Sequence, residues 1–357
     1  SLNGRPGGLE SLSDEDIFRA VERLHLRAEG SYSVVAVITG WGVIAFRDPN
    51  GIRPLSMGSR VVNGFTERVF ASESVVCDTL GFNHDGDVSP GEAIVARMDG
   101  TFSSKQCSTD VLHSPCIFEH VYFARPDSVL DGVSVHSSRI RMGAFLAERI
   151  SKEFPDHGIQ SVIAVPDSGR IAALELARVM GVPYREGFVK NRYIGRTFIM
   201  PGQNVRKDSV RKKLNTIEQE FSDKVVLIVD DSIVRGNTSR RIVAMAREAG
   251  AKKVYFASCS PPIVHPNVYG IDMPAKSEYV AYGRTISEIS DAIGSDWLIY
   301  QNLDDLVEAC KGNAEPEFSN FDCSCFDGIY VTGGISDEYL DRIEKIRSDK
   351  AKGSASM

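Results

Sequence analysis

One segment, residues 225–239, constrains the fold more than any other part of this 357-residue chain. Its sequence is VVLIVDDSIVRGNTS: an apolar run, two adjacent carboxylates, and then a turn that contains hydroxyl groups and one glycine. A short apolar run that leads through a turn into a helix is typical of a strand buried on both faces of a parallel sheet. Open α/β sheets bind ligands at the carboxyl ends of such strands. The segment therefore predicts an α/β fold with a binding site after residue 229.

The residue types of this segment indicate which ligand it would bind. The N-terminus of the following helix offers free N–H groups and a positive dipole, which suit a phosphate, and Gly236 allows the backbone to approach closely. Asp230 and Asp231 can hold Mg²⁺ or accept hydrogen bonds from sugar hydroxyls. The simpler alternative is an ordinary capped helix after an acidic turn, but two adjacent carboxylates repel each other unless something binds them. A ligand with both a sugar diol and phosphates satisfies the whole segment.

The rest of the chain indicates two regions. Residues 1–106 predict a helix over 14–27, capped by Ser13, and antiparallel strands over 33–39, 42–46, 68–71 and 93–97. From residue 117 onward, apolar runs alternate with helices, which predicts a parallel sheet covered on both faces. Its strands are expected at 161–165, 224–229 and 253–258, and a charged helix is expected at 337–348.

Composition excludes several classes of protein. The net charge of −7 argues against a protein that binds nucleic acid through bulk positive charge. The most apolar stretch, residues 34–46, is too short and too interrupted to cross a membrane. Seven scattered cysteines do not predict a disulfide framework, and they favour a reducing intracellular compartment. Seven scattered histidines show no spacing typical of metal ligands.

Residues 225–239 resemble the phosphoribosyl diphosphate signature of type I phosphoribosyltransferases. Other segments narrow the resemblance to the glutamine phosphoribosyldiphosphate amidotransferases, and they occur in the family's order: RDPNGIRPL (47–55), ASES (71–74), FEHVYFARPDSVLDG (118–132), VPDSGR (165–170), PYREGFVKNRYIGRTFIMPGQ (183–203) and VYGIDMP (268–274). The resemblance implies part of an N-terminal-nucleophile glutaminase domain with mixed and antiparallel sheets in residues 1–106. It implies a type I phosphoribosyltransferase domain in 107–336, and a C-terminal helix and tail in 337–357.

The resemblance also implies an activity. Members of this family are glycosyltransferases that form 5-phosphoribosylamine and pyrophosphate from phosphoribosyl diphosphate and glutamine-derived ammonia, the first committed step of purine synthesis. We therefore expect a cytoplasmic homo-oligomer that is inhibited by purine nucleotides and has no nucleic-acid or membrane partner. Two alternatives remain open: a transferase that acts on a purine or pyrimidine base, and a non-catalytic sensor that binds phosphoribosyl diphosphate.

The family's functional positions can be transferred to matching residues of this chain. The expected Mg²⁺ ligands are Ser168, Asp230 and Asp231. The residues expected to bind the phosphate and ribose are Asp230, Asp231, Ser232, Arg235, Gly236, Asn237, Thr238 and Ser239. The basic stretch 190–197 matches the family's catalytic loop, in which Lys190, Arg192 and Arg196 would bind pyrophosphate oxygens.

The sequence departs from the family in two respects. The family's glutaminase nucleophile is an N-terminal cysteine, whereas this chain begins with Ser1 and its first cysteine is Cys77. We therefore expect that the chain starts partway through the glutaminase domain and uses ammonia at most. Some relatives hold a [4Fe–4S] cluster with four cysteines, and the matching positions here are Cys116, Asn267, Asp322 and Cys325. With a C-x-C spacing at Cys323 and Cys325, we expect no cluster.

Overall fold

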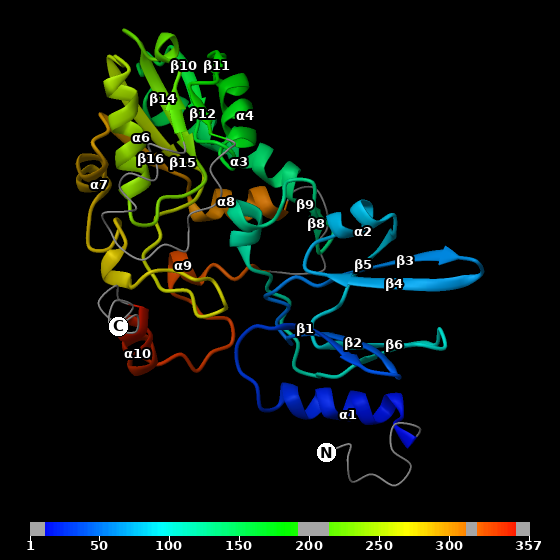
Figure 1. Ribbon diagram of the computed structural model, residues 1–357. Helices are drawn as coiled ribbons and strands as arrows, with labels where there is room; N and C mark the ends of the chain where they lie inside the picture. Colours follow the sequence, from blue (N-terminus) through cyan, green and yellow to red (C-terminus); the bar gives the residue numbers. More distant parts are fainter. Residues whose placement is uncertain (1–10, 192–213, 312–319, 348–357) are drawn as a thin grey trace, which may run out of the picture.

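The computed structural model describes residues 11–191, 214–311 and 320–347. Two regions are separate in Figure 1: helix α1 and two antiparallel sheets at one end, and a parallel sheet with flanking helices at the other. Helix α1 covers Asp14–His25 and begins as predicted, because Ser13 and Asp16 cap each other's backbone N–H groups. The fold class expected from the sequence, mixed antiparallel sheets followed by a parallel α/β sheet, is confirmed.

The first region is built from two antiparallel sheets. One has the strand order β1-β2-β6-β7 and the other has the order β4-β3-β5. Along β2, Ile44 and Phe46 pack toward α1, whereas Ala45 packs with Leu55 and Val88 on the opposite face. This alternation follows from the two-residue period of a strand. The elements are β1 (Ser33–Ile38), β2 (Gly42–Arg47), β3 (Ser56–Val62), β4 (Phe65–Ala71), α2 (Val75–Leu80), β5 (Asn83–Asp87), β6 (Glu92–Arg97) and β7 (Phe102–Gln106).

The second region is organised around a five-stranded parallel sheet with the order β11-β10-β14-β15-β16. Its strands are β10 (Ser161–Ala164), β11 (Tyr184–Arg185), β14 (Val225–Asp230), β15 (Lys253–Ser258) and β16 (Trp297–Tyr300). The chain runs from β10 to β11 on one side, and from β14 through β15 to β16 on the other. The strand order therefore reverses between β10 and β14, and this reversal is where open sheets of this kind bind ligands.

Helices cover both faces of this sheet. Leu227 and Val229 of β14 face a core shared with α3 (Val135–Glu153), α4 (Arg170–Met180) and α8 (Leu303–Lys311). Val226 and Ile228 face a second core, formed with α6 (Asn237–Glu248) and α7 (Ile286–Ile293). All four of these strand residues are fully buried, as the apolar run predicted.

The remaining elements are short or lie at the end of the described chain. They are η3 (Glu119–Phe123), β8 (Val129–Leu130), β9 (Val133–Ser134), the pair β12 (Phe188–Lys190) and β13 (Leu214–Thr216), η4 (Glu218–Glu220), η5 (Lys276–Glu278), α9 (Ser324–Asp327) and α10 (Asp337–Arg347). In the described parts of the chain, no helix has the length and apolar character needed to cross a membrane.

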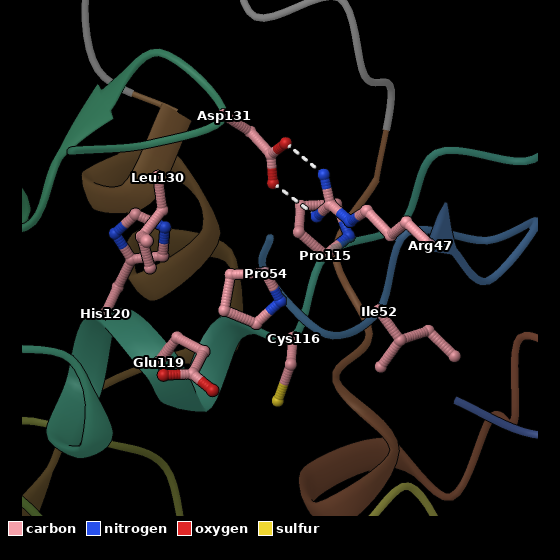
Figure 2. Close-up of a pocket in the computed structure, with 9 residues that line it drawn as sticks. All are labelled: Arg47, Ile52, Pro54, Pro115, Cys116, Glu119, His120, Leu130 and Asp131. Carbon is pink, nitrogen blue, oxygen red and sulfur yellow. Dashed lines mark hydrogen bonds and ion pairs between the residues drawn. The ribbon is translucent and has the colours of Figure 1, made fainter. Parts of the chain in front are cut away.

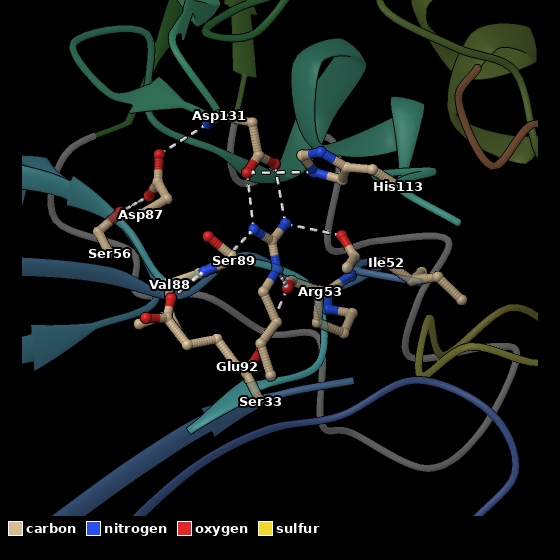
Figure 3. A network of polar contacts seen from close by, with 12 residues as sticks. Ser33, Ile52, Arg53, Ser56, Asp87, Val88, Ser89, Glu92, His113 and Asp131 are labelled. Atoms are coloured by element: carbon tan, nitrogen blue, oxygen red, sulfur yellow. Dashed lines mark hydrogen bonds and ion pairs between the residues drawn. The ribbon is translucent and has the colours of Figure 1, made fainter. Parts of the chain in front are cut away.

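A buried ion pair joins the two regions, and Figure 3 shows the network of polar contacts around its acidic partner, Asp131. Arg47, at the end of β2, is fully buried and makes a two-pronged contact with Asp131, with N–O distances of 2.6 and 2.8 Å. The remaining N–H groups of Arg47 donate to the carbonyls of Gly51, Arg53 and Val88 at 2.7–3.1 Å. The backbone N–H of Asp131 donates in turn to Asp87 at 2.8 Å.

Asp131 ends a segment, residues 125–131, that donates further hydrogen bonds to the first region. The Glu73 carboxylate accepts from the Arg125 backbone at 2.8 Å and from the Ser128 hydroxyl at 2.7 Å. The Ser74 hydroxyl accepts from the Val129 backbone at 2.8 Å. The RDPNGIRPL and ASES segments therefore act together, since both hold the stretch of chain that leads into α3.

Candidate active site

Asp230 and Asp231 lie at the carboxyl end of β14, where the sequence predicted them. Asp230 is the last residue of the strand, and Asp231 opens the turn that leads to α6. Each is only 7% exposed, so both carboxyl groups are largely shielded from water. The backbone N–H of Asp231 donates to the Asp230 side chain at 3.0 Å, which keeps the two groups side by side.

The turn after the neighbouring strand β10 completes the site. Ser168 follows β10 and donates its hydroxyl to Asp231, so the structure brings two segments that lie some sixty residues apart into direct contact. Gly169 is required here, because a Cβ at this position would lie 2.6 Å from the Val229 carbonyl oxygen. Both segments sit at the reversal of strand order, and the three expected Mg²⁺ ligands are therefore adjacent.

The electrostatics of the pair favour a bound cation. Burial, followed by the neighbouring charge of Asp231, raises the pKa of Asp230 well above its usual value. Burial also raises the pKa of Asp231, although hydrogen bonds from Ser168 and Ser232 work in the opposite direction. Two desolvated carboxylates ionise together only when a positive charge compensates them. The site can therefore stabilise a divalent cation or a ligand that brings one.

The residues expected to bind phosphate occupy the turn 232–236 and the start of α6. Gly236 has a φ of +72°, and a Cβ there would lie 2.9 Å from Val280, so only glycine fits without strain. Asn237 and Thr238, in the first turn of α6, are exposed and face solvent. This arrangement leaves the first N–H groups of α6 available to an anion.

Three other members of the expected phosphate-binding set are either paired with a protein group or buried. Ser232 donates its hydroxyl to Asp231 at 2.5 Å, and Arg235 forms an ion pair with Glu278 at 2.7 Å. Ser239 is 3% exposed and faces the interior. These three side chains therefore stabilise the turn. The groups left to contact a ligand are the backbone N–H groups and the exposed Asn237 and Thr238.

Of the three expected catalytic cations, only Lys190 lies within the described residues; Arg192 and Arg196 lie outside them. Lys190 ends β12, and its Nζ lies 2.7 Å from the Asp167 carboxylate in the turn that also contains Ser168. The structure therefore places the Lys190 ammonium beside the turn expected to bind pyrophosphate.

Sequence reasoning missed two residues next to the carboxylate pair. Arg139 of α3 is 4% exposed and donates to the carbonyls of His120 and Ala124, and its positive charge offsets part of the rise that burial causes in the pKa of Asp231. Cys259 follows β15, and its N–H donates to the Asp230 carbonyl at 2.9 Å. Neither residue belongs to a recognisable motif, so no sequence signal pointed to them.

A small cavity lies elsewhere, between the two regions (Figure 2). None of the residues expected to bind phosphoribosyl diphosphate lines it. Its walls come from both regions, with the Arg47–Asp131 ion pair on one side and Glu119 and His120 of η3 on the other. The lining residues are Arg47, Ile52, Pro54, Pro115, Cys116, Glu119, His120, Leu130 and Asp131.

The residues at the four positions compared with the [4Fe–4S] ligands do not fit such a cluster. The Asn267 side-chain oxygen accepts from the backbone N–H groups of Tyr269 and Ile271. The Asp322 carboxylate accepts from the Ser324 backbone at 3.2 Å. Both side chains therefore brace turns of the backbone. Within the described ranges, no group of three or more His, Cys, Asp or Glu residues is arranged to hold a metal ion.

Comparison with known proteins identifies the family to which the chain belongs. Residues 135–260 match the phosphoribosyl transferase domain family, so the region that contains the carboxylate pair is a phosphoribosyltransferase domain. The amidophosphoribosyltransferase of Pseudomonas aeruginosa is 54% identical over 343 residues, which cover 96% of this chain and 68% of that protein. The enzyme of the same name from Saccharomyces cerevisiae is 47% identical over 350 residues, covering 97% and 68%. The chain belongs to the amidophosphoribosyltransferase family and spans about two-thirds of the length of these relatives.

Two solved structures show the same fold. The glutamine phosphoribosylpyrophosphate amidotransferase of B. subtilis, complexed with ADP and GMP, has a TM-score of 0.76 and 36% identity, and the match covers 91% of this chain and 72% of that one. A structure described as the allosteric regulatory enzyme of purine biosynthesis has a TM-score of 0.79 and 37% identity, covering 96% and 70%. The resemblance inferred from the sequence is confirmed.

Proposed function

We propose that this chain catalyses the displacement of pyrophosphate from phosphoribosyl diphosphate by ammonia, which gives 5-phosphoribosylamine. The observation that carries this proposal is the contact between Ser168 and the buried pair Asp230–Asp231 at the reversal of strand order. The domain boundaries proposed from the sequence, 1–106, 107–336 and 337–357, place this site in the transferase domain. In the family's reaction, glutamine supplies the ammonia.

Mg²⁺ is the cation that we propose for this site. Asp230, Asp231 and the Ser168 hydroxyl offer hard oxygen ligands, which Mg²⁺ prefers. Mg²⁺ usually takes one or two carboxylates from the protein and completes its shell with water and substrate phosphates. This coordination preference fits a site with two carboxylates. When bound, the ion neutralises negative charge on the departing pyrophosphate.

The residues of the chain then have separable roles. The turn 232–236 and the first N–H groups of α6, with Asn237 and Thr238, hold the 5′-phosphate. Lys190 stabilises the charge that builds on pyrophosphate as the C1–O bond breaks, and we assign the same role to Arg192 and Arg196. The lone pair of ammonia forms the C1–N bond, and the proton that the product amine sheds goes to solvent. Because ammonia is a competent nucleophile, positioning contributes more than a general base.

Further properties are proposed from relatives. The complex of the B. subtilis enzyme with ADP and GMP supports inhibition of this chain by purine nucleotides. We also propose that the protein is a cytoplasmic homo-oligomer, as the resemblance implies. We propose that the chain holds no [4Fe–4S] cluster. Measurement of iron and labile sulfide in the purified protein tests this.

Pyrophosphate release from phosphoribosyl diphosphate and Mg²⁺ tests the proposal. We expect release with ammonia, and we expect the double substitution Asp230→Asn/Asp231→Asn to reduce it by about 100-fold or more, as for other lost transition-state contacts. Asp99→Asn, in an exposed turn after β6, makes the same chemical change outside the site and should leave release unchanged. Full activity in the double variant would refute the site. Release only when a purine or pyrimidine base is added would indicate a base transferase instead.

A further inference from the structure

An acidic side chain stands in the turn that should bind an anion. The turn after β10 contains Asp167, Ser168 and Gly169, and under the proposed function it faces pyrophosphate. Ser168 points to the carboxylate pair through its bond to Asp231. Asp167, one residue earlier, has a side chain that is 63% exposed and holds the Lys190 ammonium at 2.7 Å. A carboxylate at this position would repel pyrophosphate, so its presence needs a reason.

The second cation at this turn is also paired with a carboxylate. Arg170, the first residue of α4, forms an ion pair with Glu186 at 3.3 Å, and Glu186 also accepts from the Tyr184 hydroxyl at 2.9 Å. Glu186 lies outside the turn, between β11 and β12, whereas Asp167 lies within it. Lys190 is thus the cation whose partner occupies the anion-binding turn itself.

We propose that Asp167 is a positioning residue that exchanges Lys190 with pyrophosphate. In the free enzyme, the Asp167 carboxylate holds the Lys190 ammonium over the turn. When substrate binds, a pyrophosphate oxygen takes over the ammonium, and when pyrophosphate leaves, Asp167 recaptures it. This inference rests on the proposed function of the site. It adds that Asp167 competes with pyrophosphate for the Lys190 ammonium. The consequence is a lower affinity for pyrophosphate, because Lys190 can form an ion pair with Asp167 again when pyrophosphate dissociates.

The exposure of the pair sets the size of the effect. Both side chains are more than half exposed, at 55% for Lys190 and 63% for Asp167. Exposed ion pairs contribute at most about 1 kcal/mol, which corresponds to roughly fivefold in an equilibrium constant. Removing the competitor should therefore tighten pyrophosphate binding by about two- to fivefold.

Titration calorimetry of the full chain with pyrophosphate and Mg²⁺ tests the proposal without requiring turnover. We expect Asp167→Asn to lower the dissociation constant by the stated factor. In a Lys190→Met background, the same substitution should have no effect, because no ammonium remains to be exchanged. Asp167→Glu keeps the charge and should bind pyrophosphate like the wild type. Glu153→Gln is the matched control, since Glu153 forms an equally short pair, 2.7 Å from Arg149, at the end of α3.

The outcomes separate the possible roles of Asp167. Equal tightening with and without Lys190 would mean simple repulsion between Asp167 and pyrophosphate, and the exchange would be wrong. Weaker binding or unchanged binding in Asp167→Asn would also overturn it. A wild-type chain that binds no pyrophosphate at all would instead overturn the proposed function, before Asp167 is touched.

Discussion

Replacing Asp131 with Asn tests how the two regions are joined. The substitution keeps the shape of the side chain but removes the charge that compensates Arg47, whose own side chain is completely buried. Breaking a buried ion pair by removing one partner costs about 3–5 kcal/mol, because the remaining charge stays desolvated. An asparagine amide also brings N–H groups toward a guanidinium that can only donate. We therefore expect Asp131→Asn to lower the free energy of unfolding by that amount.

Urea denaturation at neutral pH measures this change, and an exposed pair supplies the control. Arg60 and Glu67 approach equally closely, at 2.7 Å, but their side chains are 39% and 45% exposed. Glu67→Gln should therefore cost less than about 1 kcal/mol. Equal losses in Asp131→Asn and Glu67→Gln would refute the reasoning, because burial would then have no part in the strength of the pair.

The pH dependence provides a second check on the same pair. Burial alone would raise the pKa of Asp131, but the hydrogen bonds and charge of Arg47 hold it well below its usual value. A carboxyl group with a lowered pKa stabilises the fold above its unfolded pKa of about 4, and this contribution is lost as the pH falls. The difference in stability between the wild type and Asp131→Asn should therefore be full at pH 6 and shrink below about pH 4.

Two further predictions concern buried sites in the transferase domain. Burial raises the pKa of Asp322 to about 6, so its contribution should lower the free energy of unfolding as the pH rises from about 4 to 6, by up to about 3 kcal/mol. Asp322→Asn can still accept from Ser324 and should remove that part of the pH dependence; identical curves for the two proteins would refute the shift. A Cβ on Gly143 of α3 would lie 2.2 Å from the Ala172 carbonyl oxygen of α4. Gly143→Ala should therefore destabilise the fold by about 1–3 kcal/mol in thermal or urea unfolding, and an unchanged midpoint would mean that these helices do not touch there.

The strands that could be predicted from the sequence are those with continuous apolar runs. The strand at 253–258 was predicted with the observed bounds, and β14 is shifted by one residue, so that Asp230 belongs to the strand. By contrast, β3, β5 and β7 of the first region were missed, and so was β16 of the parallel sheet, although its four residues are apolar. Asn83–Asp87 contains no apolar side chain at all, and it is a strand only because its backbone pairs with β3. Pairing of this kind depends on tertiary contacts, which a local pattern does not contain.

The candidate site also contains residues that the sequence predicts and residues that it does not. The position of Asp230 and Asp231 could be predicted from the residues themselves, because carboxylates after a buried strand lie where such sheets bind ligands. Ser168 was predicted through the family resemblance. The pairing of Lys190 with Asp167 could not be, since it depends on where β12 lies against the turn after β10. The position of Arg139 near the carboxylate pair could not be predicted either, because in the sequence Arg139 is one of several basic residues with no motif around it.

The hydrogen bonds to residues 125–131 bear on how this family can change over evolutionary time. Glu73, Ser74, Asp87 and Arg47 belong to one region, while the groups that they bind belong to the stretch that leads into the other. A chimera that takes each half from a different ancestor would keep both folds, but the buried Arg47 guanidinium could then face a side chain that does not compensate its charge. We expect the two halves to be inherited together, with Arg47 and Asp131 substituted as a pair or not at all.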